Sequence, residues 1–108
     1  MKNTTVSVSF RLLKLDMMQA YTLKKDIRGA HFYPSSVDGV FVGVVPLHEA
    51  IFDELNDYVI RQQVQYDDCD IFVEATKNNK ASEVSVPRVV NKILKYIDCK
   101  LTYALRFD

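Results

Sequence analysis

The spacing of apolar residues changes along this chain between two periods, and this feature constrains the fold more than any other. Over residues 5–12, apolar and polar side chains alternate, which predicts a strand with one buried face. Over about 47–63, apolar side chains recur at every fourth position, with acidic residues between them, which predicts an amphipathic helix. A chain that switches repeatedly between these patterns is typical of an α+β domain.

The remaining elements follow from the same patterns and from turn residues. They are a helix over about 16–28, a loop over 30–39, a strand over 40–45, a hairpin over 69–86, a helix after Pro87 and a last strand over 101–107. The predicted order is β-α-β-α-β-β-α-β, a mostly antiparallel sheet with helices on one face. Residues 40–107 match the ferredoxin-like (split βαβ) order. No linker interrupts the chain, so residues 1–108 are predicted to form a single domain.

Three local signals sharpen this prediction. Asp16 and Gln19 have the spacing of a capping box, which marks the start of a helix. Gly43 interrupts an apolar strand, which indicates a bulge or a close approach of another backbone or side chain. In the last strand, apolar side chains alternate from Leu101 to Phe107, and we expect this face to be part of the core.

Composition excludes some functions. The 14 basic and 14 acidic residues give a net charge of zero, which argues against nonspecific binding to nucleic acids or membranes. No run approaches the roughly 18–20 apolar residues of a membrane span, and no apolar signal-peptide core is found. Cys69 and Cys99 lack a CxxC spacing, and the sequence leaves open whether they meet. We therefore expect a cytoplasmic protein with reduced thiols.

Residues that could carry catalysis are few. His31 and His48 match no zinc-binding spacing, and glycine-rich phosphate loops and nucleophile motifs are missing. The acidic cluster of Asp67, Asp68 and Asp70 lacks the pattern of a calcium loop and is read as a solvated turn. No catalytic residue, metal or cofactor is predicted, and an enzyme is the less favoured class.

Basic side chains cluster at two places, and they provide a third hypothesis, which is nucleic-acid binding. The clusters are Lys24, Lys25 and Arg28 at the end of one predicted helix, and Arg88, Lys92 and Lys95 along another. The strand consensus of RNA-recognition domains is absent, so solvated helix faces are the better interpretation.

The apolar strand 40–45 predicts self-association. Its side chains are apolar on both sides, and exposed surface of this kind is commonly covered by a second copy of the chain. Val40, Val42 and Val44 are therefore the predicted interface of a homodimer. The alternative is that the loop 30–39 covers this strand within one chain.

The leading functional hypothesis is a non-enzymatic module that binds another protein. The predicted contact surface combines the loop with an acidic helix face, through His31, Phe32, Tyr33, Glu49, Asp53, Glu54 and Asp57. Acidic side chains on a chain of zero net charge would complement a basic partner, such as a toxin or a nucleic-acid-binding effector. The alternative hypothesis is a small-ligand pocket, or an enzyme with a weak signature, that uses His31, His48 and Tyr33.

One segment carries a resemblance. In residues 89–103, a helix passes tightly into an edge strand, and this arrangement resembles the end of several small bacterial domains, some of them immunity proteins. The resemblance implies a binding protein rather than an enzyme.

Overall fold

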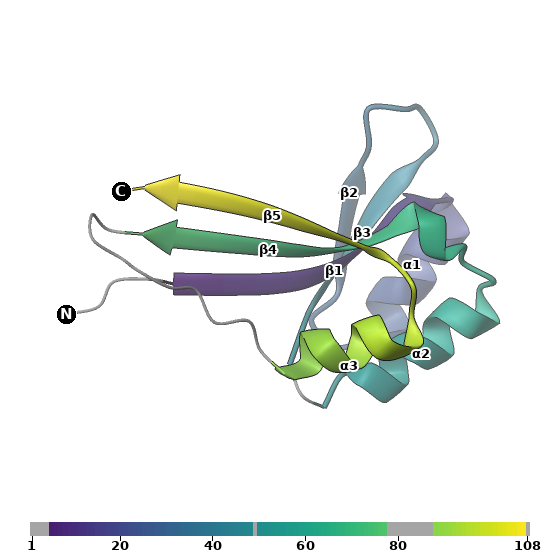
Figure 1. The fold of residues 1–108 in the computed structure, drawn as a ribbon. Helices are drawn as coiled ribbons and strands as arrows, with labels where there is room; N and C mark the ends of the chain where they lie inside the picture. The colour runs from purple at the N-terminus through teal and green to yellow at the C-terminus, as the bar shows by residue number, and fades with distance from the viewer. Residues whose placement is uncertain (1–4, 49, 78–87, 108) are drawn as a thin grey trace.

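The structure is a computed structural model that describes residues 5–48, 50–77 and 88–107. Within these residues, three α-helices pack on one face of a five-stranded mixed sheet, which confirms the predicted α+β class (Figure 1). The elements are β1 (Thr5–Leu15), α1 (Met17–Asp26), β2 (His31–Pro34), β3 (Phe41–Pro46), α2 (Phe52–Arg61), the 3₁₀ helix η1 (Tyr66–Asp68), β4 (Cys69–Lys77), α3 (Arg88–Tyr96) and β5 (Lys100–Phe107).

The first strand lies at the centre of the sheet. The strand order is β2-β3-β1-β4-β5, and β1 pairs antiparallel with both β3 and β4. Strands β3 and β4 therefore run parallel, with β1 between them and α2 connecting them, as in a split βαβ unit. The last strand, β5, pairs in parallel with β4. The hairpin strand at 84–86, on which the ferredoxin-like order of 40–107 rests, falls outside the described residues.

One strand lies where the sequence predicted a loop. Residues His31–Pro34 form β2, which pairs antiparallel with β3, and the predicted loop 30–39 is wrong over this stretch. The Ser35 N–H donates to the Val40 carbonyl over 2.9 Å and closes the turn that follows. In that turn Gly39 has a φ of +80°, in the left-handed region that glycine adopts most readily. Four strand residues that end in proline give too short an alternation to be recognised in the sequence.

The predicted capping box is confirmed at the start of α1. The Gln19 N–H donates to Asp16 Oδ1 over 2.7 Å, and the Asp16 N–H donates to Gln19 Oε1 over 3.0 Å. In contrast, the predicted start of the second helix near 47 is wrong, because α2 begins at Phe52. The Leu47 N–H donates to the Val8 carbonyl over 3.0 Å, and this bond holds the chain against β1 instead of in a helix.

The core lies between the helices and the sheet. The fully buried side chains include Phe10, Leu12 and Ile71 from the strands and Leu23, Leu55 and Ile93 from the helices. Gly43 of β3 lies against the Leu23 side chain of α1. A Cβ atom at this position would lie 2.5 Å from Leu23 Cδ2, so the predicted close approach is confirmed. The pairing of β1 with β3 shifts register between Leu12 and Leu15, which places a bulge in β1 beside Gly43.

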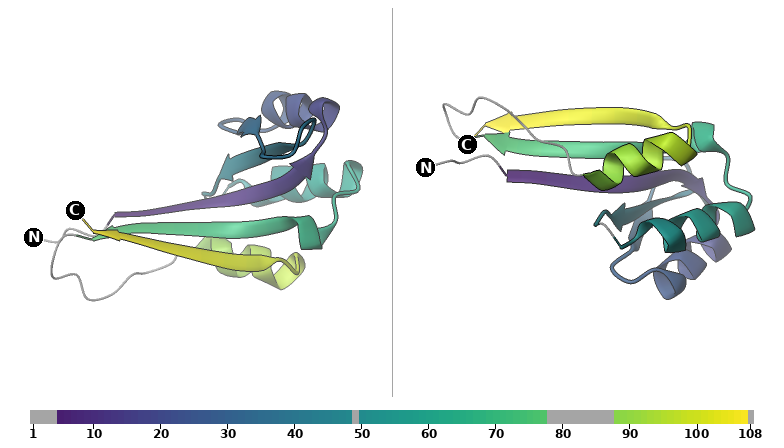
Figure 2. Two further views of the ribbon diagram at one scale, coloured as in Figure 1. Left: turned by 90° about the horizontal axis from the view of Figure 1, so that it is seen from above. Right: turned by 60° about the horizontal axis from the view of Figure 1, so that its bottom comes forward.

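The long strands β1, β4 and β5 extend well beyond the helices to one side of the molecule (Figure 2). The helices therefore cover only part of the sheet face on which they pack. None of the helices in the described ranges is long and apolar enough to cross a lipid bilayer. We call the sheet face opposite the helices the open face.

Candidate functional site

The three predicted contact residues of β2 lie on different faces of the sheet. Phe32 is opposite Gly43 and faces the helices, where its ring centroid lies 5.2 Å from that of Tyr21 and 5.7 Å from that of Phe41. His31 and Tyr33 are exposed and lie on the open face. Phe32 therefore contributes to packing, and only its two neighbours are available on the open face.

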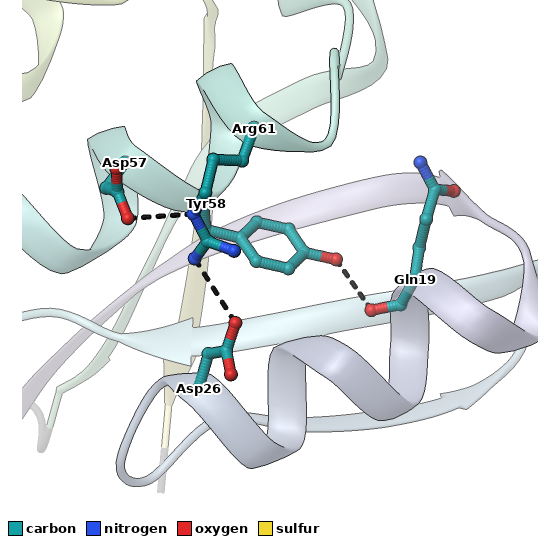
Figure 3. Close-up of polar contacts among 5 residues, drawn as sticks. All are labelled: Gln19, Asp26, Asp57, Tyr58 and Arg61. Atoms are coloured by element: carbon teal, nitrogen blue, oxygen red, sulfur yellow. Dashed lines mark hydrogen bonds and ion pairs between the residues drawn. The ribbon is translucent and has the colours of Figure 1, made fainter.

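The acidic side chains of α2 lie on the other side of the molecule, in the helical layer. Asp53, Glu54 and Asp57 are exposed, whereas Glu49 falls outside the described residues. Asp57 accepts a hydrogen bond from Arg61 Nε over 2.9 Å, and Arg61 Nη2 also pairs with Asp26 of α1 over 3.2 Å (Figure 3). The hydrogen bonds to Asp57 and Asp26 raise the pKa of Arg61.

Two consequences follow for the predicted contact surface. Its two halves, around β2 and along α2, do not form one continuous patch. Within the acidic half, Asp57 already has a cationic partner, which lowers its value for binding a basic protein. Asp53 and Glu54 stand in the first turn of α2, where negative charge interacts favourably with the helix dipole.

Tyr58 fixes the packing of α2 against α1. Its side chain is fully buried, and its hydroxyl donates to the Gln19 carbonyl over 2.6 Å (Figure 3). Burial raises the pKa of Tyr58 well above its ordinary value, and the nearby carboxylates of Asp16 and Asp26 act in the same direction. The buried Tyr58 ring and its hydrogen bond thus hold α2 against α1.

The backbone and most side chains of the apolar strand 40–45 find their partners within one chain. It forms β3, which is paired on both edges, by β2 and by β1. Val42 is buried, and Val40 and Val44 are half-buried. The pairing with β2 means that residues of the predicted loop flank this strand instead of covering its face.

Within the described strands, the most exposed large apolar side chains lie on β5, while others are exposed on the helices, such as Met18 and Ile60. Leu101 is 53% exposed and Tyr103 is 51% exposed. The expectation that this face belongs to the core is wrong for these two residues. They lie beside Ile71 and Val73 of β4, which are fully buried on the helix-covered face. The apolar face of the sheet therefore continues onto β5, where the helices no longer cover it.

The strand that carries these side chains is also an edge of the sheet. Among the described residues, no strand pairs with the outer side of β5, which is eight residues long. The opposite edge, β2, has only four residues and ends in Pro34, which cannot donate a backbone hydrogen bond. A long edge with exposed apolar side chains is the kind of surface that another strand can pair with.

A buried charge at the centre of the open face was not predicted. Asp70 of β4 is 3% exposed and accepts a hydrogen bond from Arg11 Nε over 2.8 Å and a second from Arg11 Nη2. The Thr102 hydroxyl of β5 donates to the same carboxylate over 2.7 Å. The Arg11 guanidinium also lies 4.3 Å from the centre of the Phe72 ring. One carboxylate thus connects three neighbouring strands.

These contacts determine the charge state of the pair. Burial alone would raise the pKa of Asp70, but the hydrogen bonds from Arg11 and Thr102 outweigh it and lower this pKa. The hydrogen bond to Asp70 is the main cause of a raised pKa for Arg11. The other acidic residues of the predicted cluster lie apart from this pair, with Asp68 3.6 Å from Lys14 Nζ and Asp67 exposed.

Hollows accompany the helical layer, and two of them are lined by residues that the structure describes. The larger, of about 630 Å³, lies between the end of α1 and the start of α2 and is lined by Lys25, Asp26, Arg28, His48, Ala50, Ile51 and Glu54. It includes His48, whereas His31 and Tyr33 do not line it. A second hollow, of about 460 Å³, lies near the end of α2 and includes Tyr66 and Asp98.

The basic residues of α3 contact aromatic rings. Lys92 Nζ lies 5.0 Å from the centre of the Phe52 ring, and Lys95 Nζ lies 5.8 Å from that of Tyr96. Over the described ranges, no three side chains of the metal-binding types gather into one cluster. Comparison of the chain with protein-family models, with curated proteins and with solved structures found no match.

Proposed function

We propose that this chain is a non-enzymatic protein-interaction module that self-associates through the outer edge of β5. The observation that carries the proposal is the half-exposed pair Leu101 and Tyr103 on an eight-residue edge strand. The resemblance of residues 89–103 to the end of small bacterial domains, some of them immunity proteins, agrees with this function, and we expect the protein to act in a bacterial cytoplasm.

Two properties of the edge favour a second copy as the partner. An edge strand presents unpaired backbone N–H and C=O groups, which another strand can satisfy. Antiparallel pairing of β5 with its copy about a two-fold axis is self-complementary, and it joins the two sheets into one. The homodimer predicted from residues 40–45 is thus retained, but its interface moves from β3 to β5.

Side-chain chemistry narrows the pairing register. A two-fold axis at Ala104 brings Tyr103 of each copy close to Tyr103 of the other, on the same face of the joined sheet. In this register the two rings lie diagonally across the paired strands, a separation that aromatic side chains can span. We therefore place the two-fold axis at Ala104.

Solution mass tests this interface directly. We expect light scattering to give the mass of a dimer at high concentration and a fall towards the monomer mass on dilution. Tyr103→Lys should weaken the dimer at least tenfold, because it places a charge in the apolar part of the contact. Met18→Lys is the matched control, since Met18 is an exposed apolar residue on α1, away from β5. A monomer at every concentration, or equal weakening by both variants, would overturn the proposal.

The acidic side chains that remain available on α2 support a second contact, with a basic protein. Asp53 and Glu54 are exposed and would offer electrostatic complementarity to such a partner. The double variant Asp53→Asn, Glu54→Gln should slow the association with a basic protein, and this effect should shrink as salt is added. An unchanged association rate at low salt would exclude this surface.

A small-ligand site is the second candidate function, and the hollow beside His48 favours it. Its volume of about 630 Å³ is within the range of ligand pockets, and its lining mixes cationic and anionic side chains. A small polar ligand bound there should raise the melting temperature of the protein. The rise should disappear in His48→Ala and persist in His31→Ala, because His31 does not line this hollow.

A further inference from the structure

The two cysteines stand side by side at the start of neighbouring strands. Cys69 is the first residue of β4, and Cys99 directly precedes β5. These strands are parallel, and Asp70 pairs with Lys100, so one step back along both chains places Cys69 beside Cys99. Neighbouring strands lie about 4.8 Å apart, and disulfides join residues whose Cα atoms are about 4.4–6.8 Å apart. The backbone thus meets the main geometric requirement for a bridge.

Both thiols also lie on the same side of the sheet. Residues in register on parallel strands point to the same face. Cys69 is fully buried in the core beneath the helices, and Cys99 is half-buried and packs against the same core. Both cysteines are free.

We propose that Cys69 and Cys99 form a redox site, a dithiol that a low-molecular-weight disulfide such as glutathione disulfide converts into an intramolecular bridge between β4 and β5. This inference is independent of the proposed self-association, because it rests on the start of β5 and not on its outer edge.

The reaction proceeds by two thiol–disulfide exchanges. Cys99 is the more exposed thiol, so its thiolate attacks one sulfur of glutathione disulfide, forms a mixed disulfide and releases one glutathione thiolate. Cys69 then loses its proton and attacks the Cys99 sulfur, which forms the bridge and releases the second glutathione. Two protein thiols are oxidised, and one glutathione disulfide is reduced to two glutathione molecules.

Burial makes this site slow at neutral pH. It is the main cause of the raised pKa of Cys69, to about 12, and of Cys99, to about 11. The attacking species is the thiolate, so the rate of bridge formation should rise about tenfold per pH unit below these pKa values. The site would thus respond to sustained oxidising conditions and not to brief ones.

Mass spectrometry of the full-length chain tests the proposal. After incubation with excess glutathione disulfide at mildly alkaline pH, we expect the mass to fall by about 2 Da with no thiol left to alkylate. Proteolysis should give a cross-linked pair of peptides that contain Cys69 and Cys99. The bridge closes a loop of about 30 residues, so the melting temperature should rise by roughly 10 °C or more.

Cys99→Ser is the control variant, because the half-buried position tolerates serine better than the fully buried Cys69 does. It should fold and show no loss of about 2 Da, and the only change in its mass should be a slow addition of glutathione. Its melting temperature should not rise with the oxidant. The proposal is overturned if the native chain keeps two alkylatable thiols at equilibrium, if it forms only glutathione adducts or bridges between chains, or if the internal bridge appears only in denaturant.

Discussion

Asp70 shows how a charge is retained inside a sheet of this kind. The carboxylate of a buried Asp70 needs partners for its lone pairs, and Arg11 and Thr102 supply them from the strands on either side. The guanidinium in turn rests on the Phe72 ring, which limits its freedom to leave the carboxylate. Together, Arg11, Asp70 and Thr102 therefore fix the relative register of β1, β4 and β5.

Removing the charge of Asp70 should destabilise the fold. Asp70→Asn leaves the Arg11 guanidinium without its counter-ion, and we expect a loss of roughly 2–4 kcal/mol in the free energy of unfolding. Thr102→Val is the milder comparison, since it removes one hydrogen bond to a charged group and should cost about 1–2 kcal/mol. Urea denaturation of both variants measures these differences. Equal stability of Asp70→Asn and the parent protein would show that the pair contributes nothing.

The same pair predicts a dependence of stability on pH. The pKa of Asp70 is lower in the folded protein than its ordinary value, which is about 3.9 in an unfolded chain. The unfolded state therefore takes up a proton first, and the stabilisation present above about pH 4 is lost as the pH falls through the folded pKa. Denaturation midpoints measured from pH 6 down to about pH 3 should fall less steeply in Asp70→Asn.

Tyr58 gives the opposite pH dependence. Burial raises its pKa in the folded protein, so the unfolded state loses the phenolic proton first, and stability should decline as the pH rises above about 10. Tyr58→Phe should remove this component of the alkaline decline and cost about 1 kcal/mol at neutral pH, because the hydrogen bond to the Gln19 carbonyl is lost. Tyr96→Phe, at an exposed position, should leave the stability at neutral pH unchanged.

The roles of these residues could not be predicted from the sequence patterns, for a physical reason. Asp70 was grouped with Asp67 and Asp68 because the three are close in the chain, but its partner Arg11 is 59 positions away. Local periodicity in a sequence carries no information on which strands become neighbours in the sheet. The proximity of Cys69 and Cys99 was open for the same reason, since it depends on the parallel pairing of β4 with β5.

At the scale of elements, the packing of α1 on β3 depends on a missing side chain. Gly43→Ala would place a Cβ atom 2.5 Å from Leu23 Cδ2 and 2.8 Å from Leu15 Cδ1, inside a closely packed core. We expect a cost of about 1–3 kcal/mol, measured by chemical denaturation. Leu23→Val removes part of this clash. The double variant Gly43→Ala, Leu23→Val should therefore lose less stability than the sum of the losses in the two single variants. Strict additivity would contradict this contact.

The elements themselves were largely predictable. The alternation over residues 5–12 and the capping box at Asp16 gave β1 and the start of α1, because both signals are local. The exposed face of β5 could not be predicted, since an alternating strand has the same pattern whether or not a helix covers it. Only the position of the helical layer decides this, and Leu101 and Tyr103 remain half-exposed beside it.

For the whole molecule, self-association should appear as protection of one edge. In the monomer, the outward amides of β5 have no strand partner among the described residues and should exchange their hydrogens quickly. At concentrations where the dimer forms, these amides should become protected while those of central β1 remain unchanged. Hydrogen exchange at two concentrations separated by a factor of about 100 measures this difference. Protection of β5 that does not depend on concentration would contradict a dimer.

The central position of β1 also has a consequence for synthesis on the ribosome. This strand is translated before both of its neighbours, β3 and β4. Its backbone N–H and C=O groups therefore stay without strand partners until those segments have been synthesised. Its apolar face is a transient hazard for aggregation, or a binding site for a chaperone, until β4 has emerged. From that point β1 can pair on both of its edges, and α3 and β5 then complete the core and the sheet.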